Sequence, residues 1–293
     1  LDIEMPKMDG LTFLRKIMQH HPLPVVVVSA FTQADSDLAL AVFEAGAVEV
    51  LAKPGGPRSA GKKDELHLTA TIREAANIDV GTLKRRKTDQ RKIVRSQPIG
   101  SSPQGMVNKV IALGASTGGT KALEKVLNDF PVDSPGVVIV QHMPANFTKS
   151  FAKRLDRTSP LTIREAREGD ILSQGTALLA PGGRHLRVER KGYGYRVRLD
   201  DSERIHFQKP AVDPLFSSVA EAAGKNAIGV LLTGMGRDGA SGLLAMRQHG
   251  AYTIAQDEAS SIVFGMPRAA IELGAACEVL ALQKITAAIF KVQ

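Results

Sequence analysis

Short runs of β-branched residues alternate with helical patterns in two separate parts of the chain, and this alternation limits the possible fold more than any other feature. Four consecutive valines at 25–28 have the length and composition of a buried parallel strand. A second strand is expected at 48–51 and helices before, between and after the two strands, the last at 64–76. Strand–helix–strand order predicts a parallel sheet with right-handed crossovers. The apolar positions that fall on one helical face are Leu11, Leu14, Ile17 and Met18, and then Leu38, Ala41, Val42 and Ala45.

The alternation resumes from residue 107 and continues toward the end of the chain. Residues 185–200 differ, because apolar and charged residues alternate around a Lys-Gly-Tyr-Gly turn, which predicts an antiparallel hairpin. This part is therefore predicted to be a doubly wound, mostly parallel α/β domain with one antiparallel hairpin. Its expected strands are 110–113, 137–140, 177–180, 229–232 and 252–255.

The segment between the two parts has no hydrophobic periodicity and is rich in Lys, Arg, Ser, Pro and Gly. Between Lys84 and Arg95 lie seven basic residues and one acidic residue, which account for most of the formal net charge of +8. Because the excess charge sits in a short tract and not on a domain face, we interpret it as a solvated linker. The predicted organisation is a first domain at 1–76, a basic linker at 77–105 and a second domain at 106–293.

Composition excludes several classes of protein. The chain has 293 residues, enough for two domains, and a single cysteine, Cys277, so an internal disulfide is impossible. The single cysteine fits a reducing, cytoplasmic location. There is no apolar run of about 18 residues and no signal-peptide pattern. The chain opens at Leu1 in the middle of a motif, and we expect it to be a fragment that lacks its true N-terminus.

A possible nucleophile follows the first strand of the second domain. Residues 114–118 read Gly-Ala-Ser-Thr-Gly and precede a helix expected to start near Thr120, which is the context that the G-x-S-x-G pattern needs. The backbone N–H after Ser116 would face a developing oxyanion. The alternative is a glycine-rich, phosphate-binding turn at a helix N-terminus. Lys121 follows the glycines, but the G-x-x-x-x-G-K-[ST] pattern is absent, and pattern alone leaves both readings open.

A base and a carboxylate follow two other strands. His142 ends the strand at 137–141, at the carboxyl edge where open α/β sheets build their sites. Asp238 lies in the glycine-rich turn after 229–232, and it could instead be the N-cap of the helix from Ala240. The order Ser, His, Asp differs from that of α/β-hydrolases, so a triad here would belong to another fold. The competing histidines are His185, His206 and His249, the last of which is expected to cap a helix end.

Five separated motifs occur in order in the second domain. They are Gly-Ala-Ser-Thr-Gly-Gly at 114–119, Gln-His-Met-Pro at 141–144, Ala-Pro-Gly-Gly at 180–183 with His185, Pro-Ala-Val-Asp at 210–213 and Leu-Thr-Gly-Met-Gly-Arg-Asp-Gly-Ala at 232–240. Together they resemble the chemotaxis response regulator protein-glutamate methylesterases, the CheB family. The resemblance implies that Ser116 is the nucleophile, His142 the base and Asp238 the group that orients it. It also implies that the backbone N–H groups of Thr117 and Met235 form the oxyanion hole.

The first domain resembles part of a response-regulator receiver, which is a flavodoxin-like fold. Residues 1–10 match its phosphoacceptor motif, with Asp2 at the phosphorylated position, Ser29 at the switch hydroxyl and Lys53 at the motif lysine. Receivers bind Mg²⁺ through an acidic pair at the end of their first strand, and this chain starts after that point. The resemblance therefore implies Mg²⁺ for phosphorylation of the full-length protein, no complete metal site in this chain, and no cofactor for catalysis.

The resemblance implies a function and a set of partners. The expected reaction is hydrolysis of glutamate methyl esters on chemotaxis receptors, with possible glutamine deamidation, regulated by receiver phosphorylation from the chemotaxis histidine kinase. The unphosphorylated receiver is expected to cover the active site. The protein would be peripheral at receptor arrays, with no membrane insertion and no nucleic acid. The rivals are a response regulator that binds DNA through 84–95, which predicts salt-dependent binding, and a nucleotide-binding domain around 110–120.

Overall fold

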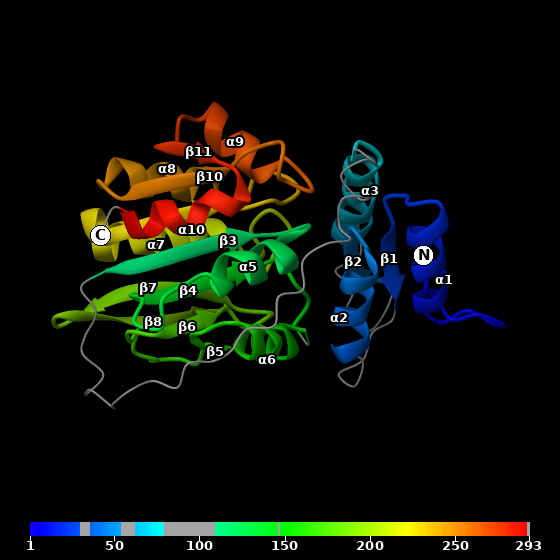
Figure 1. Cartoon of the computed structure of the whole chain (residues 1–293), viewed down its shortest axis with the longest axis horizontal. Coiled ribbons are helices and arrows are strands. Elements are labelled where there is room, and N and C mark those ends of the chain that lie inside the picture. The colour runs from blue at the N-terminus through cyan, green and yellow to red at the C-terminus, as the bar shows by residue number, and fades with distance from the viewer. Residues whose placement is uncertain (30–35, 54–61, 79–108, 146, 292–293) are drawn as a thin grey trace. The chain divides into compact units, whose positions relative to one another are not determined.

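The computed structural model describes residues 1–29, 36–53, 62–78, 109–145 and 147–291, which belong to two compact units (Figure 1). The units are Leu1–Arg91 and Lys92–Gln293. Most of the expected linker, from residue 79 to residue 105, lies outside the described residues. Within the described ranges, none of the helices combines the length and the apolar character needed to span a bilayer.

The described residues of the first unit form two parallel strands and three helices. Strand β1 (Val26–Ser29) pairs with β2 (Glu49–Ala52), and Val27 lies opposite Val50. Helix α1 (Gly10–His20) begins where the side chain of Asp9 accepts the N–H of Thr12, an N-cap contact. The remaining helices are α2 (Ser36–Ala45) and α3 (Lys62–Ala76). The parallel strands and all three expected helices are confirmed.

The second unit is built on a seven-stranded sheet in which every paired neighbour is parallel (Figure 1). Its strand order is β11-β10-β9-β3-β4-β6-β5, so the order reverses between β3 and β9. Open α/β sheets bind ligands beyond the carboxyl ends of the strands at such a switch point. The strands are β3 (Val110–Ala115), β4 (Gly136–Gln141), β5 (Thr162–Glu165), β6 (Thr176–Leu179), β9 (Ala227–Leu231), β10 (Tyr252–Gln256) and β11 (Glu278–Leu280).

Helices cover both faces of this sheet, as expected for strands whose residues are buried throughout. Helix α5 (Gly119–Asn128) packs against α6 (Thr148–Thr158) and α10 (Leu282–Lys291). On the other face, α7 (Val212–Ala223) packs against α8 (Ala240–Gln248), which packs against α9 (Met266–Glu272). A 3₁₀ turn, Gly224–Asn226, joins α7 to β9.

The expected hairpin forms a separate two-stranded antiparallel sheet of β7 (His185–Lys191) and β8 (Gly194–Asp200). Its apolar residues, including Leu186 and Val197, join the core beneath α7. The predicted fold class, a receiver-like parallel sheet followed by a mostly parallel α/β domain with an antiparallel hairpin, is confirmed. The edge strands β5 and β11 were not predicted, and α5 begins one residue earlier than expected, at Gly119.

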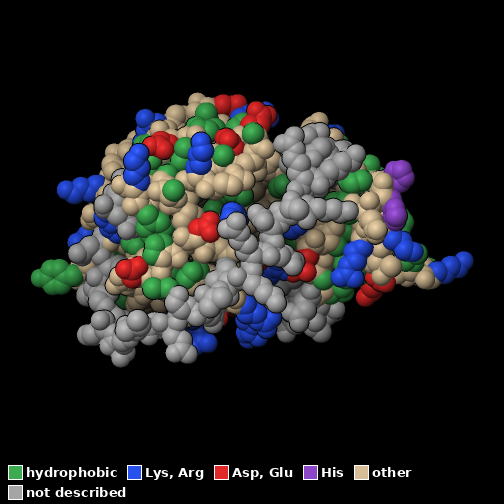
Figure 2. All heavy atoms as spheres, in the orientation of Figure 1, with side chains coloured by type: hydrophobic (Ala, Val, Ile, Leu, Met, Phe, Trp, Pro, Cys, Tyr) green, Lys and Arg blue, Asp and Glu red, His purple; other side chains and the backbone are tan. Residues whose placement is uncertain are grey.

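Basic and acidic side chains are both scattered over the described surface that faces the viewer in Figure 2, where blue and red patches lie among tan and green ones. The tract at 84–95 that carries the positive excess lies outside the described residues. Mixed charge of this kind is typical of an ordinary solvated surface, whereas nucleic-acid binding uses a basic patch or stripe.

Candidate active site

Ser116 and His142 come together because they follow paired positions of neighbouring strands. In the parallel register of β3 and β4, Ala115 lies opposite Gln141, and the N–H of His142 donates to the carbonyl of Ala115 at 3.1 Å. Neighbouring strands are about 4.8 Å apart, so the next residues on each strand lie side by side at the carboxyl edge. Ser116 is 3% exposed and His142 4% exposed, so both belong to the interior of this edge.

Asp238 reaches the same edge from β9, which pairs with β3 on its other side. Its Oδ2 lies 2.7 Å from Nε2 of His142, and both side chains are buried. Burial opposes ionisation of Asp238, but the contact with His142 and two backbone N–H groups outweigh it and hold the pKa of this carboxyl below its ordinary value of 3.8. A carboxylate at Nε2 holds the proton on that nitrogen and leaves Nδ1 as the proton acceptor of His142.

The alternative role of Asp238 as the N-cap of its own helix is wrong. The N-cap of α8 is Gly239, in a left-handed conformation with φ 85°, and α8 has no side-chain cap. The carboxylate turns instead to the start of α7, where it accepts the N–H groups of Val212 at 2.6 Å and Asp213 at 3.0 Å. In return, Oδ1 of Asp213 accepts the N–H of Gly242 in the first turn of α8 at 2.7 Å. Asp238 is thus a cap, but of another helix.

The turn after β3 is closed by its glycines and by the loop after β9. Gly118 takes the left-handed conformation, with φ 79°, and a Cβ added there would lie 2.6 Å from Ile262. The N–H of Ser116 donates to the carbonyl of Thr233 at 3.0 Å, and the N–H of Gly119 donates to the carbonyl of Ser116 at 2.7 Å. The turn therefore uses one of the helix N-terminal N–H groups internally, which disfavours the phosphate-loop interpretation.

Two buried polar side chains that the sequence pattern did not single out hold this edge together. Nε2 of Gln141 donates to the carbonyls of Ser116 at 2.8 Å and His142 at 3.1 Å. The hydroxyl of Thr233 donates to the carbonyl of Thr117 at 2.9 Å. It also accepts two N–H groups of the loop after β10, those of Ile262 and Val263, each at 3.0 Å. In the sequence, Gln141 and Thr233 are each a polar residue at the end of an apolar run, and this pattern could have identified them.

The residues expected to form an oxyanion hole lie beside Ser116 in sequence or in space. Thr117 follows Ser116 directly and is buried, and Met235 follows Gly234 and is half-buried. Gly234 is packed against the serine, because a Cβ added at Gly234 would lie 2.8 Å from the Cβ of Ser116 and 2.2 Å from Sδ of Met266. The roles of Thr117 and Met235 remain predictions.

The competing histidines have other partners. His185 is fully buried; its Nε2 lies 2.9 Å from the carbonyl of Glu203, and its Nδ1 accepts the N–H of Ala211 at 3.1 Å. Both ring nitrogens are therefore used to shape the backbone before α7. His249 is the C-cap residue of α8, in agreement with its expected place at a helix end. His206 contacts Asp213 at 3.3 Å, at the back of the Asp238 carboxylate.

In the first unit the three expected receiver residues meet at one edge of the strand pair. Nζ of Lys53 lies 2.5 Å from Oδ2 of Asp2, and this contact lowers the pKa of the Asp2 carboxyl. The N–H of Lys53 donates to the carbonyl of Ser29 at 3.1 Å. Asp2 offers an oxygen ligand of the kind that Mg²⁺ prefers.

Comparison with known proteins supports the family resemblance of both units. Residues 111–289 match the family model of the CheB methylesterase, and residues 1–62 match that of the response regulator receiver domain. The chain is 49% identical over 292 residues to a Pseudomonas aeruginosa protein named protein-glutamate methylesterase/protein-glutamine glutaminase 2. The match covers 99% of this chain and 82% of that protein. A Chromohalobacter salexigens protein of the same name, without the number, is 48% identical over 292 residues, with coverage of 99% and 81%.

A solved structure supports the fold of the second unit. The crystal structure of the Thermotoga maritima CheB methylesterase catalytic domain matches with a TM-score of 0.62 and 39% sequence identity, covering 63% of this chain and 98% of that chain. The family resemblance drawn from the five motifs is thus confirmed over the greater part of the chain. The chain belongs to the CheB methylesterase family and also contains a response regulator receiver domain.

Proposed function

We propose that this protein hydrolyses methyl esters of glutamate side chains on chemotaxis receptors and also deamidates glutamine. The observation that supports this best is the buried contact of 2.7 Å between His142 and Asp238, made where Ser116 follows the neighbouring strand. The names of the relatives give the same two reactions for those proteins.

The chemistry is acyl transfer through the serine. His142 takes the proton of the Ser116 hydroxyl at Nδ1, while Asp238 stabilises the imidazolium through Nε2. The serine oxygen attacks the ester carbonyl, and the N–H groups of Thr117 and Met235 stabilise the oxyanion. Methanol leaves with the proton from His142, and water, activated by the same base, releases the acid and restores the serine. For glutamine the leaving group is ammonia.

The first unit would regulate this reaction through phosphorylation of Asp2. Lys53 would neutralise the phosphoryl oxygens and Ser29 would report their arrival, since the three residues are joined at one edge. Asp2 would supply one oxygen ligand to the Mg²⁺ that phosphorylation needs. The phosphodonor is the chemotaxis histidine kinase. Before phosphorylation the receiver would cover the active site, and phosphorylation would remove this block.

The proposed organisation is a receiver at 1–76, a linker at 77–105 and a catalytic domain at 106–293. The protein would work in the cytoplasm, peripheral at receptor arrays, without nucleic acid and without a cofactor in the ester hydrolysis.

Methanol release from methylated receptor, measured with the wild type and Ser116→Ala, tests the proposal. Loss of the nucleophile should lower the rate by on the order of 10³-fold or more. Ser241→Ala, a change of an exposed serine on α8, is the matched control and should retain the wild-type rate. Circular dichroism of both variants should match the wild type. Methanol release by Ser116→Ala at the wild-type rate would refute the mechanism.

A further inference from the structure

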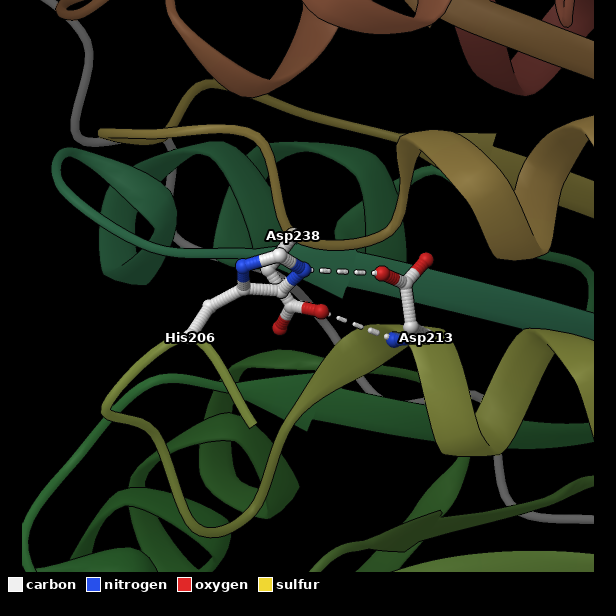
Figure 3. A group of neighbouring side chains, drawn as sticks. All are labelled: His206, Asp213 and Asp238. Carbon is white, nitrogen blue, oxygen red and sulfur yellow. Dashed lines mark hydrogen bonds and ion pairs between the residues drawn. The ribbon is translucent and has the colours of Figure 1, made fainter. Parts of the chain in front are cut away.

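A second histidine–aspartate pair lies behind the Asp238 carboxylate. His206, Asp213 and Asp238 come from the segment after the hairpin, from α7 and from the loop after β9, and their ligand atoms all lie within 4.8 Å of one another (Figure 3). Figure 3 shows the imidazole of His206 directed at the Asp213 carboxylate, while the backbone of Asp213 reaches Asp238. Of these three residues, the proposed acyl transfer uses only Asp238, so the placement of His206 and Asp213 beside it needs an explanation.

The surroundings of Asp213 disfavour the charged form of its carboxyl group. Burial, and then the negative charge of Asp238, raise the pKa of the Asp213 carboxyl above its ordinary value of 3.8, whereas the pKa of Asp238 is lowered. The contact with His206 acts in the opposite direction and favours the charged form of Asp213. The charge on Asp213 is therefore linked to Asp238 on one side and to His206 on the other.

The backbone around His206 is held in a conformation that its sequence disfavours. His206 and Phe207 both have positive φ, 50° and 64°, in a two-residue turn closed by reciprocal backbone hydrogen bonds between Ile205 and Gln208. Such turns normally carry glycine or asparagine. Strained residues of this kind persist where the surrounding structure requires them and are concentrated at functional sites. Here the turn presents the imidazole to Asp213, and the side chain is 41% exposed, so it can exchange protons with water.

The other charged groups nearby are directed elsewhere or exposed. On the His206 segment, Lys209 donates to the carbonyl of Asp201 and pairs with its carboxylate at 3.9 Å, and Arg204 is exposed. On the loop of Asp238, Arg237 is exposed. Helix α8 meets Asp213 through the N–H of Gly242, and His142 meets Asp238 from β4.

We infer that His206 and Asp213 are positioning residues that act through Asp238 and set the pH range in which His142 serves as the base. Asp213 adds a second negative charge behind Asp238 and so favours protonated His142. His206, when protonated, offsets that charge. The inference rests on the proposed ester hydrolysis and adds a control of its pH dependence.

The same three side chains resemble a ligand set for a divalent cation. However, Asp238 already directs its two oxygens to His142 and two backbone N–H groups, and Asp213 directs one to Gly242. These contacts favour a hydrogen-bonded network. The pH profiles that test the inference are therefore measured with a chelator present, so that a bound metal cannot produce the shift.

The test is the acidic limb of the pH profile of kcat/KM for methanol release, which reports the essential base of the free enzyme. Asp213→Asn should move the midpoint of this limb to lower pH, and His206→Asn to higher pH. Each shift should be at least about half a pH unit, as expected for a unit charge within roughly 10 Å of a buried base. The double variant should match Asp213→Asn alone, because His206 acts through Asp213.

Asparagine suits the left-handed turn at position 206, so His206→Asn removes the charge without disturbing the backbone. Phe207→Asn, in the same turn but outside the cluster, is the matched control and should leave the limb in place. Unchanged limbs in both charge variants, or shifts in the same direction, would overturn the inference. A uniform fall in kcat at every pH would also overturn it, because it would indicate a purely structural role.

An NMR titration of the His142 imidazole separates this inference from the proposed function. If the wild type released no methanol, the proposed function would fail. The titration midpoint of His142 in Asp213→Asn should still lie below that of the wild type, and equal midpoints would refute the inference by themselves.

Discussion

Asp238 caps the helix that contains Asp213, and Asp213 binds the first turn of the helix that follows Asp238. The carboxylate of Asp238 accepts the first two N–H groups of α7, and that of Asp213, the second residue of α7, accepts the N–H of Gly242 in the first turn of α8. Each negative charge thus lies at the positive end of a helix dipole. The orientation of the Asp238 carboxylate is therefore fixed by the start of α7, and rotation of Asp238 would break its two contacts with α7 and its contact with His142.

Replacement of Asp238 by Asn should destabilise the protein most at neutral pH. Because the folded pKa of Asp238 is lowered, its contribution to stability is present above about pH 3.8 and is lost as the pH falls through the folded value. We expect a loss of about 1–3 kcal/mol at pH 7, since Asn cannot accept all three hydrogen bonds. Thermal unfolding at pH 7 and pH 3 should show the difference from the wild type narrowing in acid.

Asp213→Asn is the matched comparison for that measurement. The folded pKa of Asp213 is raised, so its charge opposes folding at neutral pH, and Asn retains an oxygen for the N–H of Gly242. We expect unchanged or slightly higher stability at pH 7. A loss of stability as large as that of Asp238→Asn would show that the charge on Asp213 favours folding, contrary to this expectation.

Gly234→Ala should reduce activity more than stability. The new methyl group would lie 2.8 Å from the Cβ of Ser116, so the serine or its loop must shift, and a displacement of about 1 Å can cost on the order of 100-fold in rate. Sδ of Met266, at 2.2 Å, lies near the end of a flexible side chain and can move. The measurements are kcat for methanol release and the melting temperature.

Gly274→Ala provides the control for a glycine substitution as such. Gly274 has φ 66° and open space around its Cβ position, so alanine there should cost stability through backbone strain alone. Its kcat should equal that of the wild type. Equal kcat values for Gly234→Ala and the wild type would show that the serine tolerates the displacement.

Thr233→Val should loosen the loops after β3 and β10 together. The substitution keeps the shape but leaves the buried N–H groups of Ile262 and Val263 and the carbonyl of Thr117 without the hydroxyl. We expect a loss of about 1–3 kcal/mol in unfolding free energy together with lower kcat. Thr233→Ser, which keeps the hydroxyl, should restore most of both. If Thr233→Val kept both values and Thr233→Ser lost them, the methyl group and not the hydroxyl would be the important part of Thr233.

A fragment of residues 106–293 should hydrolyse the ester faster than the unphosphorylated full chain. The expectation follows from the proposed cover of the active site by the receiver, and a catalytic domain 39% identical to this one has been crystallised. Initial rates on methylated receptor at equal enzyme concentration decide the point. Equal rates for the fragment and the full chain would remove the inhibition from the proposal.

The fold was largely predictable from periodicity, because the central strands are buried on both faces and appear as continuous apolar runs. The strands at the sheet edges were not. In β5 only Ile163 is buried, between charged and exposed neighbours, and β11 has three residues that are exposed or half-buried. Edge strands bury too little surface to leave a pattern.

The sequence predicted those site residues whose positions depend on one strand, but not the contacts that depend on how helices pack. Ser116, His142 and Asp238 could be placed at carboxyl ends because each lies at the end of an apolar run or in the turn that follows it. The link from Asp238 to α7 and the contact of His206 with Asp213 join residues whose relation depends on how α7 and α8 pack. The only capping role considered for Asp238 was consequently the alternative one, at the helix that follows it in sequence.

The strand order also determines when the enzyme can first act during its synthesis. Ser116 and His142 follow strands that are made early, but β9, which leads into the loop of Asp238, is inserted beside β3 only after the hairpin and α7 have been completed. A ribosome-bound chain that has emerged as far as residue 230 thus has its serine and histidine but no carboxylate between α7 and His142. In the proposed mechanism, the unfinished polypeptide would lack the carboxylate that orients the base, and full activity would begin only when nearly the whole C-terminal sheet has assembled.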